Sequence, residues 1–72
     1  MPENPLHRLT IGQRHALRVL FKAGWNYAEA ARRLRVAEPT VRATVHRAID
    51  RAGVAARDDL AYWLGREDES AL

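Results

Sequence analysis

The sequence contains no cysteine, and this absence excludes several kinds of protein at once. Disulfide bonds are ruled out, and so are metal sites built from thiolates. No apolar run approaches the ~20 residues that a membrane-spanning helix needs. The start of the chain, MPENPLHRLT, also lacks the apolar core of a signal peptide. We therefore expect a cytoplasmic protein with no membrane partner.

Groups that support catalysis are also scarce. A chain of 72 residues forms one small domain, and such a domain buries only about 60% of its unfolded surface, which leaves little room for a deep pocket. The histidines His7, His15 and His46 lie in separate segments without metal-ligand spacing. The sequence has no glycine-rich phosphate loop, and its one serine, Ser70, is close to the end. We expect neither an enzyme nor a bound metal or cofactor.

Acidic residues are few in most of the chain. Residues 1–57 hold eleven Lys or Arg and four acids, a balance of +7, whereas residues 58–72 hold one Arg and five acids, a balance of −4. A basic body with an acidic end is typical of a protein that binds a polyanion on one face. A plain solvated surface is the alternative interpretation.

The central stretch, residues 25–51, predicts two helices joined by a tight turn. Apolar side chains in residues 27–34 recur at i, i+3, i+4 and i+7, which places them on one face of a helix. Residues 39–52 repeat an inward apolar pattern, and Pro39 suits a first helical turn because its missing amide hydrogen would have no partner there. The connection, residues 35–37, has the length of a helix-turn-helix.

Residues at the start of the first of these helices predict how it is capped. Asn26 is the expected N-cap, and Glu29, three residues later, would complete a capping box. Trp25 is expected to pack over Ala30 as a hydrophobic staple.

A further helix of about residues 11–23 is expected before this pair. Thr10 would cap it, and Gly24 would end it by adopting the left-handed conformation. One side of this helix carries a basic stripe, which either contacts a DNA backbone or simply faces solvent. The stripe consists of Arg14, Arg18 and Lys22.

A fourth helix, of about residues 56–64, is expected after Gly53. The fold class predicted is therefore all-α, a small four-helix domain that contains a helix-turn-helix. We expect a flexible N-terminal arm at residues 1–8, the domain itself at residues 9–65, and a disordered acidic tail at residues 66–72.

Short motifs in this region resemble two families of bacterial DNA-binding domains. Residues 27–31 (YAEAA), 34–42 (LRVAEPTVR) and 46–48 (HRA) resemble the promoter-reading C-terminal domain of sigma factors, which commonly shows S-Y-x-E-I-A, L-x-V-S-x-x-T-V-K and H-R-A. Residues 53–60 (GVAARDDL) resemble the end of LuxR-type response regulators, which carry G-V-x-x-R-x-x-L. Together the two resemblances cover residues 9–64 and imply the same helical core.

The chain departs from both families at three kinds of position. Asn26 and Ala37 stand where serines are usual, Ala30 replaces the usual Ile, and Arg35 replaces the usual Gly at the turn. The last two changes are expected to weaken the core and the turn.

The resemblance and the clustered arginines predict that residues 39–52 form a recognition helix in the major groove of double-stranded DNA. Arginine can bind guanine with a bidentate fork, glutamate can accept from cytosine N4, and small apolar groups can contact the thymine methyl. The expected base-reading residues are Glu38, Arg42, Ala43, Thr44, His46 and Arg47. The expected backbone contacts are Arg32, Arg33, Arg35, Thr40 and Arg51.

We interpret the chain as a sequence-specific transcriptional regulator. One recognition helix reads too few base pairs to find one site in a genome, so a homodimer is expected. The candidate interface is the last helix, through Leu60, Tyr62, Trp63 and Leu64. Two alternatives remain open: a sigma-like module that binds RNA polymerase or another regulator, and an accessory DNA-binding protein of recombination or excision.

Overall fold

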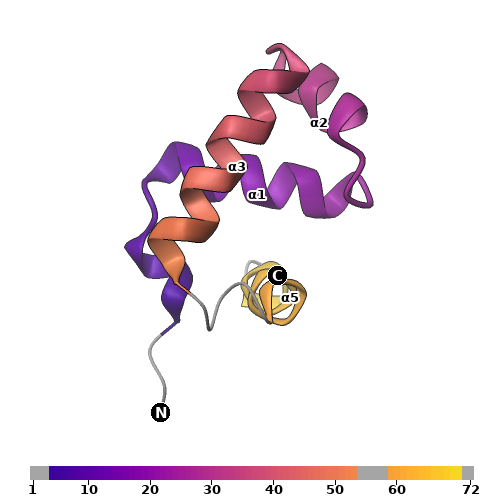
Figure 1. Cartoon of the computed structure of the whole chain (residues 1–72). Coiled ribbons are helices and arrows are strands. Elements are labelled where there is room, and N and C mark those ends of the chain that lie inside the picture. Colours follow the sequence, from indigo (N-terminus) through magenta and orange to yellow (C-terminus); the bar gives the residue numbers. More distant parts are fainter. Residues whose placement is uncertain (1–3, 54–58, 71–72) are drawn as a thin grey trace.

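The computed structural model describes residues 4–53 and 59–70 of the chain. The elements of these residues are all helical, which confirms the predicted all-α class (Figure 1). They are a short 3-10 helix, η1 (Pro5–Arg8), and the α-helices α1 (Ile11–Lys22), α2 (Tyr27–Leu34), α3 (Glu38–Ala52) and α5 (Leu60–Ser70). None of the helices described is long and apolar enough to cross a membrane.

Helix α1 begins at the predicted position and is capped more fully than expected. The Thr10 hydroxyl accepts a hydrogen bond from the Gln13 amide at 3.1 Å, and the Gln13 side chain accepts one from the Thr10 amide at 3.1 Å. This reciprocal pair is a capping box. At the other end, Gly24 adopts φ 65°, as predicted, and Trp25 also adopts a positive φ of 65°. Trp25, which was expected over Ala30, packs its ring edge-on against Phe21 of α1.

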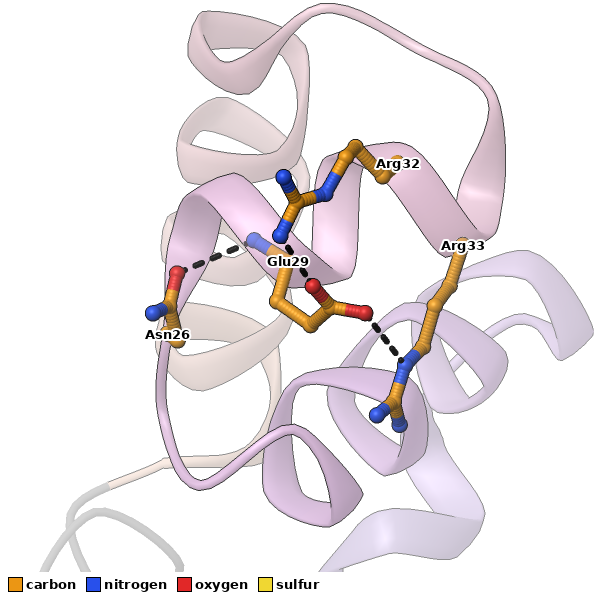
Figure 2. Close-up of polar contacts among 4 residues, drawn as sticks. All are labelled: Asn26, Glu29, Arg32 and Arg33. Carbon is orange, nitrogen blue, oxygen red and sulfur yellow. Dashed lines mark hydrogen bonds and ion pairs between the residues drawn. The ribbon is translucent and has the colours of Figure 1, made fainter.

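Helix α2 has the predicted bounds, but only half of the predicted cap. The Asn26 side chain accepts from the Glu29 amide at 2.9 Å, as expected (Figure 2). The capping box is wrong, because the Asn26 amide donates to the Ala23 carbonyl at 3.3 Å. The Glu29 carboxylate instead binds Arg32 and Arg33, one turn further along the same helix.

The turn between α2 and α3 has a left-handed residue at the position where the two families that the sequence resembles usually have glycine. Arg35 has φ 59° and ψ 43°, and its amide donates to the Arg32 carbonyl at 3.2 Å. The Val36 amide closes the turn on the Ala31 carbonyl at 3.1 Å. An arginine in this conformation has a steric cost that glycine lacks. The chain nevertheless keeps the tight reversal of a helix-turn-helix.

Helices α1, α2 and α3 pack against one another in all three pairings. α3 crosses in front of α1 in Figure 1, and α2 lies beside the start of α3. The residues between the three helices are apolar, and several are alanines that let the backbones approach closely. These core residues are Ala16, Leu17, Leu20, Ala30, Ala31, Val41, Val45, Ala48 and Ala52.

Residues 5–8, which lie in the segment expected to be a flexible arm, form η1. Asn4 caps this turn by accepting from the Leu6 amide at 2.9 Å. Leu6 is fully buried and η1 packs against α3. The Arg51 Nε donates to the Arg8 carbonyl at 2.6 Å and so fastens η1 to the last turn of α3.

Helix α5 extends further than predicted, and its inner face belongs to the core. It continues to Ser70, so it includes residues 66–70 of the segment expected to be an acidic tail. The predicted start, at residue 56, lies outside the described residues. Leu64 is buried, while Leu60 and Trp63 are half-buried against the core. α5 contacts α1 and, in Figure 1, is seen almost end-on below it.

Because Leu6 is fully buried, Leu6→Ala should lower the free energy of unfolding by about 2–5 kcal/mol, the usual range for truncating a core leucine. The matched control is His7→Ala, at the exposed next position, which should change stability by less than about 0.5 kcal/mol. Urea unfolding followed by circular dichroism measures both. Equal, small effects would mean that η1 is not part of the folded core.

Candidate nucleic-acid interface

The face of α3 opposite the core carries three of the six predicted base-reading residues, and a fourth, Arg42, is exposed beside them. Val41, Val45, Ala48 and Ala52 point into the core. Ala43, His46 and Arg47 are exposed, because they lie on the opposite side of the same helix. Among the described residues, no ion pair or hydrogen bond of the Arg47 side chain is present. This face is therefore open to a macromolecule.

Arg42 is held in place by contacts on two sides. Its NH2 lies 2.5 Å from Glu38 Oε1, and its guanidinium carbon lies 4.7 Å from the centre of the Tyr27 ring. Tyr27 opens α2, so this cation–π contact joins the beginnings of α2 and α3. The guanidinium remains accessible, since 60% of the Arg42 side chain is exposed. Two residues predicted to read bases, Glu38 and Arg42, therefore bind each other in the free protein.

Thr40 and Thr44 lie at the side of α3 that faces α1. Both line a shallow hollow of about 340 Å³ together with residues of α1 and of the turn. Thr44 is half-buried and Thr40 is exposed. Of these two predicted DNA contacts, Thr40 is the more accessible.

The outward face of α2 places Glu29 between two arginines (Figure 2). Its carboxylate binds the Arg32 guanidinium and, through Oε1, lies 3.2 Å from the Arg33 Nε. Hydrogen bonds from Arg32 and then Arg33 lower the pKa of Glu29 below its ordinary value, because they favour the charged carboxylate. The triad keeps one positive charge in excess. Both arginines remain largely exposed to a second anion.

The structure gives two further predicted backbone contacts different roles. Arg35 is exposed at the left-handed turn and is positioned beside Arg32 and Arg33. Arg51 donates to the Arg8 carbonyl, so it helps to hold η1. Arg51 thus has a structural role that the sequence analysis missed, because its partner is distant in the chain.

The candidate dimer residues of α5 do not share one exposed face. Leu64 is buried in its own chain and is not accessible to a partner. Leu60 and Trp63 are half-buried. Tyr62 is 54% exposed, and its hydroxyl accepts a hydrogen bond from Arg66 NH1 at 2.9 Å. Its ring packs edge-on against Trp63. Only the outer part of the predicted patch is therefore available.

Tyr27, which was expected only as part of the apolar face of α2, has a further role. Tyr27 is half-buried and supports the Arg42 guanidinium. The sequence signal was weak, since an aromatic residue at a core position of a helix is usually explained by packing alone. Within the residues that the structure describes, no cluster of His, Asp or Glu could hold a metal ion.

Comparison with known proteins identifies the type of domain. The sequence model of a homeodomain-like domain matches residues 8–57, which contain α1, α2, α3 and the turn between the last two. No curated protein and no solved structure matches the chain. The match supports a helix-turn-helix and leaves the closer resemblance to sigma factors or LuxR-type regulators a prediction.

The lowered pKa of Glu29 predicts how Glu29→Gln changes stability with pH. A carboxylate whose pKa falls on folding stabilises the native state above its unfolded pKa, and this contribution is lost as the pH falls through the folded value. The unmutated protein should therefore melt at a higher temperature than the variant near neutral pH. The two should melt together once Glu29 is protonated. Thermal unfolding from neutral to strongly acidic pH tests this, and a difference that persists in acid would contradict the charge-based explanation.

Proposed function

Because the chain belongs to the homeodomain-like family, a helix-turn-helix type of DNA-binding domain, we propose that it is a sequence-specific transcriptional regulator that binds double-stranded DNA. The observation that carries this proposal is the open outward face of α3, with Arg47 exposed at its centre. The major groove of DNA is about 12 Å wide and admits such a helix. Each base pair presents a distinct pattern of donors and acceptors in this groove. α3 is the recognition helix in this proposal.

Roles within this interface follow from how firmly each side chain is held. Arg47 can offer a bidentate fork to guanine O6 and N7 without first breaking a contact. Arg42 is preordered by Tyr27 and Glu38, which reduces the entropy lost when it meets a base. Glu38 can then accept from cytosine N4 on the neighbouring pair. His46, Ala43 and Thr44 complete the proposed base-reading set.

The backbone contacts proposed are Arg32, Arg33, Arg35 and Thr40. Glu29 holds the first two at the outer face of α2, where phosphates flanking the groove would lie (Figure 2). Each phosphate neutralised contributes about −0.9 to the slope of log K against log salt, so four to six contacts imply a slope of roughly −4 to −5. Binding should accordingly weaken steeply as salt is added.

Arg47→Ala and Arg32→Ala should separate base reading from backbone contact. Arg47→Ala should cost about 1–3 kcal/mol on a preferred site and much less on scrambled DNA, because the lost fork reads one base pair. Arg32→Ala should weaken both duplexes about equally and reduce the salt slope by about 1. Sites selected from random duplexes provide the preferred sequence, and fluorescence anisotropy at several salt concentrations measures binding.

Arg47→Lys is the matched control, since it keeps the charge and removes the planar fork. It should lose sequence preference almost as fully as Arg47→Ala while retaining affinity for scrambled DNA. If Arg47→Ala weakens both duplexes by the same factor, Arg47 is a phosphate contact. A salt slope near zero for the unmutated protein would overturn the DNA-binding proposal itself.

We also propose that two copies bind a palindromic site, because one recognition helix contacts only about half a turn of DNA. The surface that remains for this contact is Tyr62 with the outer edge of Trp63, since Leu64 is buried in its own chain. In such a dimer this surface of one copy would contact the same surface of the other across a two-fold axis. The two recognition helices would then bind DNA half-sites roughly 34–36 Å apart.

Sedimentation of Tyr62→Ala tests this dimer without disturbing the core, because Tyr62 is exposed. The unmutated protein should sediment as a dimer at micromolar concentration, and the variant should be a monomer that has lost cooperative binding to palindromic DNA. An unmutated protein that is monomeric both free and on DNA would refute the dimer and leave the single-site proposal intact.

A further inference from the structure

Helix α1 presents a second basic surface that the proposed DNA interface does not use. Its core side consists of Ala16, Leu17 and Leu20. The opposite side carries Arg14, His15, Arg18 and Lys22, and the helix sequence IGQRHALRVLFK contains no acid to balance them. These residues line one shallow depression of about 450 Å³ together with Ile11 and Val19. We call this surface the α1 face.

The α1 face and the reading face of α3 point away from each other. α1 and α3 pack together through their buried residues, with Leu17 and Leu20 on one helix and Val41 and Val45 on the other. Their exposed sides must therefore lie on opposite sides of the pair; Figure 1 shows the two helices crossing, with α3 in front of α1. α5 also contacts α1. Ile11, His15 and Lys22 are nevertheless exposed, and Arg14 and Arg18 are half-buried, so a duplex held by α3 leaves this part of α1 accessible to another molecule.

The α1 face combines positive charge with an exposed apolar side chain. Ile11 is 89% exposed at the start of the helix, so an apolar side chain stands at the end of the basic row. Positive side chains spaced at i, i+4 and i+8 rise about 6 Å per step along a helix. Acidic side chains at i, i+4 and i+8 of a second helix have the same distance along the axis between one another. Each acid can therefore lie opposite one cation of α1.

From this geometry we propose that the α1 face docks an acidic amphipathic helix of a partner protein while α3 holds DNA. Carboxylates of the partner would pair with Arg14, Arg18 and Lys22, and an apolar residue of the partner would cover Ile11. This inference goes beyond the DNA-binding proposal: docking of the partner does not depend on it, whereas simultaneous binding of DNA by α3 rests on it. It identifies the partner by its chemistry, as a helix with acidic residues on one side and an apolar residue at the end of that row.

Ile11 favours a protein over a second DNA duplex as the occupant. A phosphate backbone offers nothing apolar to cover an isoleucine, whereas the apolar edge of an amphipathic helix does. The arginines and the lysine of the α1 face already make interactions within the chain. A partner must therefore exchange these contacts, which predicts modest affinity and strong dependence on salt.

The test uses a labelled synthetic peptide with glutamates at i, i+4 and i+8, a leucine at the end of that row, and alanine elsewhere. Its binding to the full chain is followed by fluorescence anisotropy, with and without saturating duplex DNA. The peptide should bind equally well in both conditions. Arg18→Ala and Ile11→Ser should each weaken it about three- to tenfold, while their duplex affinity changes by less than about twofold.

Two matched controls separate this proposal from the DNA-binding one. Arg47→Ala should weaken DNA binding and leave peptide binding unchanged. A peptide of the same composition, with its glutamates shuffled off one face, should bind poorly. Displacement of the peptide by duplex, equal binding of the shuffled peptide, or no binding at all would overturn the proposal. Binding of two duplexes per chain, with one lost in Arg18→Ala, would assign the α1 face to a second DNA segment instead.

Discussion

Close contact between helices through alanine is the constraint on which the rest of the structure depends. Ala30 and Ala31 of α2 and Ala48 of α3 are all buried, and no polar or charged residue is buried among the described residues. Small side chains bring the backbones together and fix the crossing of α2 and α3, but they bury little apolar area per residue. The larger side chains Leu6 and Leu64 therefore have to come from η1 and α5. The helix-turn-helix alone buries little apolar area, and η1 and α5 add the side chains that complete the core.

The same crossing organises charge at the surface. It brings Tyr27 beneath Arg42, so that α2 supports a side chain of the recognition helix. Glu29 and Glu38 each hold arginines of their own helix. Exposed ion pairs of this kind contribute little stability, typically 0.2–1 kcal/mol. Their main effect is to restrict where the guanidinium groups lie before any ligand arrives.

Much of the fold could be predicted because its helix boundaries depend on local chemistry. Thr10 and Asn26 are caps that act within one turn, and both were predicted from the sequence. Glu29 was assigned to the wrong partner because a backbone amide and two arginines competed for one carboxylate. The helical conformation of residues 5–8 has no local signal, because the burial of Leu6 depends on α3, far along the chain. Residues 66–70 have none either, because they are a polar acidic run without apolar periodicity. The sequence predicted which residues belong to the candidate site. It could not predict the contacts between different helices that hold these side chains in place.

The link between Arg51 and the Arg8 carbonyl also bears on the order in which the chain folds. It spans 43 positions, and the entropy of closing so long a loop must be lost before the contact contributes anything. The helix-turn-helix, in contrast, joins neighbouring segments and can form without waiting for distant parts. During synthesis, η1 leaves the ribosome before α3 and has no surface to dock on until α3 has emerged. η1 is therefore made before α3 but cannot reach its native position until α3 is present, and until then Leu6 is an exposed apolar group on a nascent chain.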